Sequence, residues 1–289
     1  VVDVARDFGA TPAWVNATDD DGLAIQAALS SACPKHAVFI PHGVFHVGST
    51  VWVPPGCSVF GAGKHVATVS TLAGAFSPDP AHPVVSLQAG GTAATPTFVS
   101  DLVIQEQVVG NERKIDPAAA PLRTLLEVRG QVVVRDIRTC RDYVSPGLSR
   151  SIAHTLSMVF APASTVSIVG AAAGGRFFGL SLDHVAVPGA PGGSLVAVNN
   201  TGLPVHLYQC SAEHLVTRAM VVIFRSANVH LHAFKFESAG GENTPGSSDG
   251  SGGLLAAHGS HNVSVFGGSG NYGIMDPSLS RDIFFSWGG

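Results

Sequence analysis

A seven-residue pattern recurs along this chain, and it constrains the fold more than any other feature of the sequence. Its clearest copy is Leu231–Glu237, LHAFKFE, in which an apolar residue is followed by two variable residues and then by apolar or small residues at alternate positions. The intervals between copies are irregular, which is typical of a repeated unit whose turns share one core and carry different loops. The other copies begin at Val59, Val99, Val134, Phe177, Leu207 and Val265.

The pattern predicts two short strands joined by a bend. Leu231 faces inward before the bend at His232–Ala233, and Phe234 faces inward after it, while Lys235 and Glu237 face outward. A coil of parallel strands needs this switch at the same corner of every turn, whereas an ordinary all-β fold with chance matches does not. We therefore predict an all-β fold, a single-stranded right-handed parallel β-helix whose coils stack on one another.

One segment, Asp19 to Cys33, predicts a helix. The aspartates 19–21 are placed where acids cap a helix and complement its dipole, and Pro34 ends it. An apolar stripe at helical spacing consists of Ile25, Ala28, Leu29 and Ala32. We expect this helix to cover the N-terminal end of the coil, where unpaired strand edges would invite aggregation.

The domain organisation follows from these elements. We expect one β-helix domain over 1–289, with an N-terminal cap and leading segment over 1–63 and the coils with their loops over 64–289. Hydrophobic residues make up 45% of the chain and charged residues 12%, which is an ordered globular composition. The net charge of -4 argues against nucleic acid as a partner, and no apolar run is long enough for a membrane span.

The first 63 residues carry a resemblance to a known fold family. The stretches RDFGA (6–10), TDDDGLAIQAAL (18–29) and VFIPHGVFHVGSTVWVPPGCSVFGAG (38–63) resemble the N-terminal segment of the pectate-lyase-like β-helix superfamily. In that superfamily a similar strand leads to an Asp-capped helix and then to a strand with Pro and Gly. The resemblance implies the fold and a broad carbohydrate-active grouping, and it does not imply one particular reaction.

The last position of each repeat forms a predicted outward column. Equivalent positions in stacked coils lie one above another at about 4.8 Å, and carboxylates that close repel, so one of them is expected to hold a proton. In retaining glycosidases the two catalytic carboxyl groups are roughly 5–5.5 Å apart, which suits neighbouring members of the column. In inverting glycosidases they are roughly 6.5–9.5 Å apart, which alternate members approach, so both geometries stay open. The column reads His65, Gln105, Cys140, Asp183, Glu213, Glu237 and Asn271.

The stretch 207–238 resembles the catalytic half of the exo-β-1,3-glucanases of glycoside hydrolase family 55. Those enzymes carry a Glu-His pair followed by a Glu on the next turn, matched here by Glu213-His214 and Glu237. The resemblance implies that Glu237 is the general acid and that Glu213 orients or activates water, with Asp183 as a third catalytic candidate. Those enzymes use two β-helices, however, and this chain has room for one, so a second β-helix domain or subunit is an expected partner.

Other side chains near these acids are candidates for binding substrate. They are His214, Lys235 and Tyr208, together with Glu242 and Asp249 in the Gly/Ser-rich stretch 238–253. That stretch predicts a flexible loop, either a cleft wall or a tolerated surface insertion. We expect a polysaccharide or oligosaccharide as the ligand.

Metal and cofactor chemistry receive weaker support from the sequence. His206, His230 and His232 could present outward imidazoles to zinc, but a surface ladder of stacked histidines is the preferred interpretation, and we expect no metal and no cofactor. A calcium-dependent polysaccharide lyase would need convergent carboxylates to bind calcium and a base such as Lys235 to abstract a proton. The expected function is therefore a glycoside hydrolase acting on β-glucan, the first alternative is a non-catalytic polysaccharide-binding or structural module, and the second is a lyase.

The cysteines and glycosylation triplets bear on localisation. Cys210 is predicted to face the core and Cys140 to face outward two turns away, so these two are not expected to pair. Cys33 and Cys57 could meet in a disulfide, which would imply an oxidising compartment and secretion. Three Asn-x-Ser/Thr triplets would accept glycans in a secreted protein: Asn16, Asn199 and Asn262.

Overall fold

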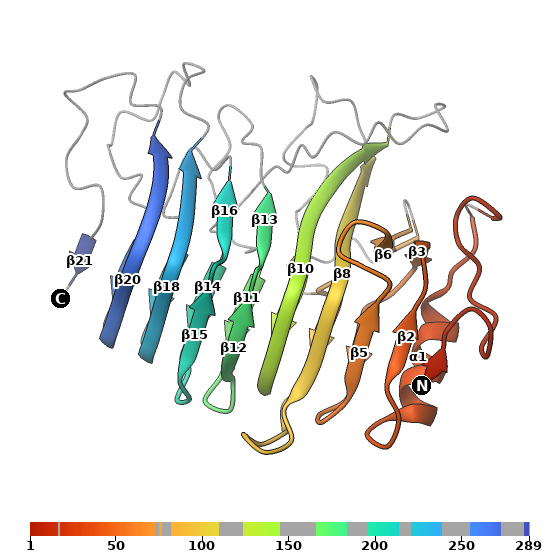
Figure 1. The fold of residues 1–289 in the computed structure, drawn as a ribbon, viewed down its shortest axis with the longest axis horizontal. Helices are drawn as coiled ribbons and strands as arrows, with labels where there is room; N and C mark the ends of the chain where they lie inside the picture. Colours follow the sequence, from red (N-terminus) through yellow and green to blue (C-terminus); the bar gives the residue numbers. More distant parts are fainter. Residues whose placement is uncertain are drawn as a thin grey trace.

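The strands coil into a right-handed parallel β-helix, shown by a computed structural model (Figure 1). It describes residues 1–16, 18–72, 75–76, 82–109, 124–144, 166–183, 196–213, 221–238, 255–272 and 286–288. For some strand ends only the backbone is described, at 108–109, 140–144, 183, 212–213, 236–238, 256, 258, 269–272 and 286–288. The predicted fold class is confirmed, since the sheets are parallel and one short helix accompanies them.

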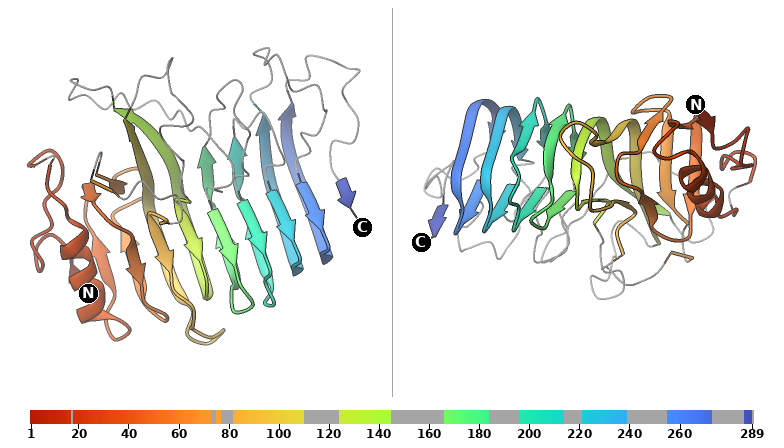
Figure 2. Two further views of the ribbon diagram at one scale, coloured as in Figure 1. Left: turned by 180° about the vertical axis from the view of Figure 1, so that it is seen from behind. Right: turned by 90° about the horizontal axis from the view of Figure 1, so that it is seen from below.

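Two sheets form the walls of the coil. The larger sheet consists of β1 (Val2–Asp3), β2 (Val38–Ile40), β3 (Gly43–Val47), β5 (Ser58–Gly61), β6 (Ala67–Thr71), β8 (Thr97–Val109), β10 (Gln131–Val144), β12 (Gly174–Phe178), β13 (Ser181–Asp183), β15 (Val205–Tyr208), β16 (Ser211–Glu213), β18 (Ala227–Ser238) and β20 (His261–Tyr272). The smaller sheet consists of β4 (Val51–Val53), β7 (Val85–Leu87), β9 (Leu126–Val128), β11 (Val166–Val169), β14 (Val196–Asn199), β17 (Val221–Phe224), β19 (Leu255–His258) and β21 (Ser286–Gly288). Figure 2 shows the two sheets as opposite layers along the same axis.

A sharp corner divides the larger sheet into two wings. The third residue of the repeat occupies this corner in the left-handed backbone region, as Ala233 does at φ 50°. Left-handed backbone turns the chain abruptly, so the strand after the corner faces a new direction. The same conformation recurs at Asp101 (58°), Asp136 (49°), Gly179 (61°), Gln209 (50°) and Gly267 (63°). The predicted bend is therefore one residue in an unusual conformation, preceded by a strand residue such as His232, which still pairs with Tyr208.

The core consists of residues that face inward on both sides of the corner. Leu231 before it and Phe234 after it are each 0% exposed, while Lys235 is half-buried, as the repeat predicts. The equivalent inward positions of the preceding coil, Leu207 and Cys210, are also buried. Burying one such side chain contributes about 1.5–3 kcal/mol, so the stack of coils holds the fold together.

The first copy of the repeat is a wrong prediction. Ala62 and His65, expected to lie inward and in the outward column, are exposed in the turn between β5 and β6. The chain inserts this turn at the corner and resumes pairing only in β6, where Ser70 lies opposite Gln105. Ser70, and not His65, therefore begins the column.

The helix α1 runs over Gly22–Ala32, so it begins three residues later than predicted. Asp20 accepts the N–H of Gly22, the first helical residue, at 2.9 Å. The Asp21 carboxylate does not cap the helix and instead accepts hydrogen bonds from the N–H groups of Thr11 (2.6 Å) and His46 (3.1 Å). These bonds tie the leading segment and β3 to the start of the helix. The predicted apolar stripe is confirmed, since Ile25, Ala28, Leu29 and Ala32 are at most 1% exposed, and α1 lies at the N-terminal end of the coil (Figure 2).

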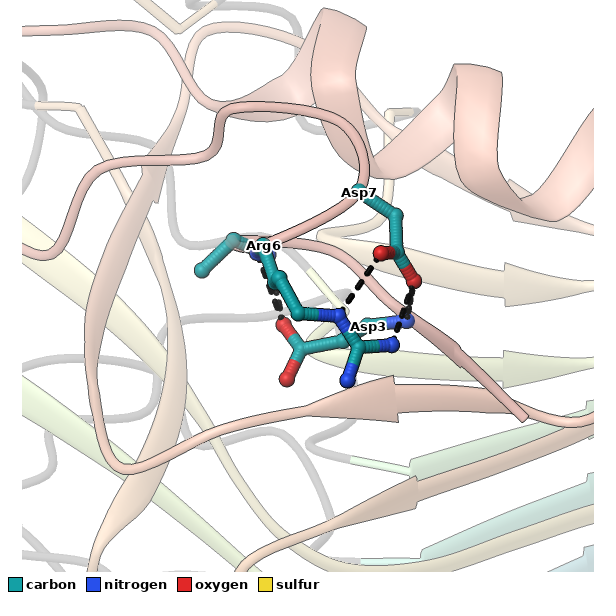
Figure 3. Close-up of polar contacts among 4 residues, drawn as sticks. Asp3, Arg6 and Asp7 are labelled. Carbon is teal, nitrogen blue, oxygen red and sulfur yellow. Dashed lines mark hydrogen bonds and ion pairs between the residues drawn. The ribbon is translucent and has the colours of Figure 1, made fainter.

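The leading segment before α1 is held by its own polar contacts. The Asp3 carboxylate accepts the N–H groups of Ala5 and Arg6, and the Arg6 guanidinium pairs with Asp7 at 2.7 Å (Figure 3). The Arg6 hydrogen bond holds the pKa of Asp7 below its usual range. Arg6 is largely exposed, so this pair shapes a turn and contributes little stability.

A disulfide joins Cys33, at the end of α1, to Cys57, with 5.0 Å between the Cα atoms. It ties the capping helix to the coil. Cys210 is a buried free thiol, and burial raises its pKa to about 12. Within the described ranges, no helix has the length and apolar character needed to cross a membrane.

Candidate functional site

The three candidate acids occupy stacked backbone positions after the corner. In the pairing of β13, β16 and β18, Asp183 lies opposite Glu213 and Glu213 lies opposite Glu237. The column continues to Asn271 on β20. We call Asp183, Glu213 and Glu237 the acid file. Adjacent members are separated by one strand spacing, about 4.8 Å.

The chemistry of the acid file stays a prediction. Only the backbone of Asp183, Glu213 and Glu237 is described, and His214, Glu242 and Asp249 lie outside the described residues. The strand register gives the order of these acids along the coil.

Lys235 lies on the same wing, two residues before Glu237. It stands opposite Ser211 on β16 and Ser269 on β20, so its neighbours in register on the outer surface are small. Residues two apart on a strand share a face, so Lys235 and Glu237 belong to one side of β18. This position is compatible with the predicted contact between Lys235 and a substrate held at the acid file.

Tyr208 lies on the other side of the corner, within a stack of rings. Its ring is 4.9 Å from Phe178 and 4.5 Å from His232, and His232 is 4.9 Å from Phe266, with interplanar angles of 10° to 14°. These rings occupy one register position of β12, β15, β18 and β20, strands that run side by side in Figure 1. Tyr208 and His232 therefore have a ring on each face, whereas Phe266, at one end of the stack, is 56% exposed.

A second row lies beside the ring stack on the same outer surface. It consists of Arg176, His206 and His230, in register with one another and with Ser264. The imidazoles of His206 and His230 are 4.9 Å apart, and His230 Nδ1 lies 2.6 Å from Ser264 Oγ. We call the two rows together the outer strip. The histidines were noted in the sequence, but Arg176 and the ring stack were missed, although an aromatic residue or His at the second repeat position in four successive coils was an available signal.

In the outer strip, the surroundings of His206 and His230 lower the pKa of both imidazoles. Partial burial lowers the pKa of His206, and His230, His232 and Arg176 lower it further. The pKa of His230 is also lowered, first by burial and then by His232. Among the described residues, no group of three or more His, Cys, Asp or Glu has the arrangement needed to hold a metal ion.

The three glycosylation triplets have different surroundings. The Asn16 side chain donates to Asp19 in an exposed turn. Asn199 Oδ1 is buried on β14 without a hydrogen-bond partner among the described residues. Asn262 donates to Asn228 on the neighbouring coil at 2.5 Å. Of the three sites, Asn16 is the least constrained by strand pairing, and glycosylation at each stays a prediction.

Comparison with known proteins gives a partial match in sequence. No family model matches the chain. A glucan 1,3-beta-glucosidase of Cochliobolus carbonum is 34% identical over 105 residues, which is 36% of this chain and 13% of that enzyme. This chain therefore spans a small part of that relative.

Comparison with solved structures gives similarities of fold. The A-module of the mannuronan C-5 epimerase of Azotobacter vinelandii is 16% identical with a TM-score of 0.38, and the match covers 93% of this chain and 77% of the module. The active domain of tailspike protein 2 of bacteriophage CBA120 is 11% identical with a TM-score of 0.43, covering 99% and 45%. An iota-carrageenase is 12% identical with a TM-score of 0.38, covering 89% and 56%. These similarities concern the fold alone.

Proposed function

We propose that this chain is a carbohydrate-active β-helix protein that hydrolyses a β-glucan-type polysaccharide with the carboxylates of the acid file. The observation that carries the proposal is the register of Glu213 on Glu237 in adjacent coils. The partial sequence match to a glucan 1,3-beta-glucosidase supports the substrate class. The disulfide between Cys33 and Cys57 supports an extracellular location, because such bonds persist in oxidising compartments.

In this proposal the two glutamates divide the work of glycosidic cleavage. Glu237 protonates the departing sugar oxygen, and Glu213 orients or activates the attacking water. Carboxylates one strand apart oppose each other's ionisation, so a proton is retained on one of them near neutrality. Asp183 is two strands from Glu237, roughly 9–10 Å at the backbone, and it offers the wider separation of an inverting pair.

Hydrolysis of laminarin-type oligosaccharides tests the proposal. We expect Glu213→Gln and Glu237→Gln each to lower the rate by about 10²-fold or more, since general acid–base catalysis is worth that much. Asp19→Asn removes one carboxylate charge from an exposed turn and serves as the matched control, expected to keep the full rate. Full activity in both glutamine variants would exclude this role for the acid file.

A non-catalytic glucan-binding or structural module is the second candidate. It is favoured by the small share of the glucosidase that this chain spans. Retention on immobilised β-glucan without any released product would support it over hydrolysis. Release of unsaturated products, detected by their ultraviolet absorbance, would instead support the lyase alternative with Lys235 as the base.

A further inference from the structure

The outer strip has the charge pattern of a binding surface for anions. The charged groups that act on His206 are His230 and His232 on β18 and Arg176 on β12. In the described part of the chain no carboxylate acts on His206 or His230. The nearest register neighbour on β10 that carries charge is Arg135, opposite Phe178, and it is paired with Asp136 at 3.0 Å. Arg176 is exposed, and none of the ion pairs among the described residues includes it, so it contributes positive charge to the strip.

Two imidazoles of the strip lack hydrogen bonds that a purely structural ladder would be expected to supply. His206 Nδ1 and His232 Nε2 are buried without a hydrogen-bond partner among the described residues. Unpaired buried polar atoms are rare and costly. Their presence on two rings of one cluster indicates that stacking stability alone does not account for these histidines.

The strip is elongated, which decides the size of the ligand. Its rows cross β12, β15, β18 and β20, and three strand spacings extend over roughly 14 Å. The apolar edges of Tyr208 and the exposed ring of Phe266 flank the imidazoles along this length. An extended ligand with both apolar faces and anionic groups fits such a surface better than a single small ion does.

We propose that the outer strip binds a polysaccharide that carries carboxylate groups, a uronate polymer, at a site separate from the acid file. The planar guanidinium of Arg176 suits bidentate contact with a planar carboxylate. The imidazoles of His206 and His230 take up protons as the anionic chain binds, because the bound charge favours their charged form. Binding is consequently tighter in mild acid and is linked to proton uptake.

Isothermal titration calorimetry with oligogalacturonate tests this site. Titrations at pH 5.5 and 7.5, in buffers of different ionisation enthalpy, report both the affinity and the protons taken up. We expect tighter binding and net proton uptake at the lower pH. Arg176→Gln should weaken binding by roughly tenfold or more, since a charge-assisted hydrogen bond contributes about 1.5–3 kcal/mol, and Arg176→Lys should restore part of the loss.

Matched controls separate the strip from the general charge of the protein. Lys35→Gln removes an exposed ammonium group and His36→Gln an exposed imidazole, both just after α1, and both variants should leave binding unchanged. His206→Gln should reduce the number of protons taken up on binding. If His206→Gln folds poorly, Arg176→Gln still tests the site, because Arg176 is exposed.

Several outcomes would overturn the proposal. If a carboxyl-reduced oligosaccharide binds as tightly as oligogalacturonate, the negative charge of the ligand does not contribute to binding. If a sulfated glycan binds more tightly than oligogalacturonate, the site does not prefer carboxylate groups. Unchanged affinity in Arg176→Gln would remove the site. Laminarin hydrolysis in the same variants reports on the acid file independently, so failure of one proposal is distinguishable from failure of the other.

Discussion

The corner residue Ala233 offers a direct test of how the coil is built. An L-residue in the left-handed region is strained by about 1–2 kcal/mol, and Ala233 occupies it at φ 50°. Glycine relieves this strain but adds about 0.5–1 kcal/mol of unfolded-chain entropy. The Ala233 side chain is exposed, so its removal loses little packing. Ala233→Gly should therefore raise the free energy of unfolding by roughly 0.5–1 kcal/mol from these two terms.

Thermal unfolding followed by circular dichroism measures this change. A stabilisation of that size raises the midpoint by about 1–4 °C in a protein of this size. Ala197→Gly, in the extended backbone of β14, is the control and should lower the midpoint, because only the entropy term applies there. Ala233→Val should lower it as well, since a β-branched residue strongly disfavours positive φ. If Ala233→Gly lowers the midpoint as much as Ala197→Gly does, the backbone of Ala233 carries no strain that glycine relieves.

Three further predictions concern the core, the cap and pH. Phe177→Ala, at a fully buried core position, should lower the free energy of unfolding by about 3–5 kcal/mol in chemical denaturation, whereas Phe224→Ala, 38% exposed on the other sheet, should lower it much less. Asp21→Ala should cost about 2–3 kcal/mol because two backbone N–H groups lose their acceptor, while Asp21→Asn, which keeps an acceptor, should cost less by the same measurement. The pKa of His206 is lowered by folding, so the unfolded chain binds more protons and thermal stability should fall as the pH drops through about 6.5; a His206→Gln variant should show a shallower decline.

The repeat pattern predicts the coil because the inward-facing positions must change parity at the corner of every turn. Leu231 and Phe234 switch parity around one corner, and the structure buries both. The disulfide partners and the order of the acid file also agree with what the sequence suggests, because register in a coil follows from the repeat itself. The fold was therefore accessible from residues alone.

Features that depend on distant parts of the chain were not accessible. The start of α1 is displaced because the Asp21 carboxylate is engaged by Thr11 and by His46, which comes from a strand later in the chain. His65 lies outside the column because the chain has an additional turn at the first corner, and a seven-residue match cannot detect such an insertion. Of the outer strip, the rings at the second repeat position could have been found by aligning four coils, whereas Arg176 has no signature of its own in the sequence.

The parallel stacking has a consequence for how such a protein can change. The segments that follow β13, β16 and β18 occupy 184–195, 214–220 and 239–254, so they differ in length, yet Asp183, Glu213 and Glu237 keep the same register. The register of these residues is set by the pairing of neighbouring strands and does not depend on the length of the segments that connect them. Exchange of these segments for ones of another length should therefore leave the register of Asp183, Glu213 and Glu237 unchanged.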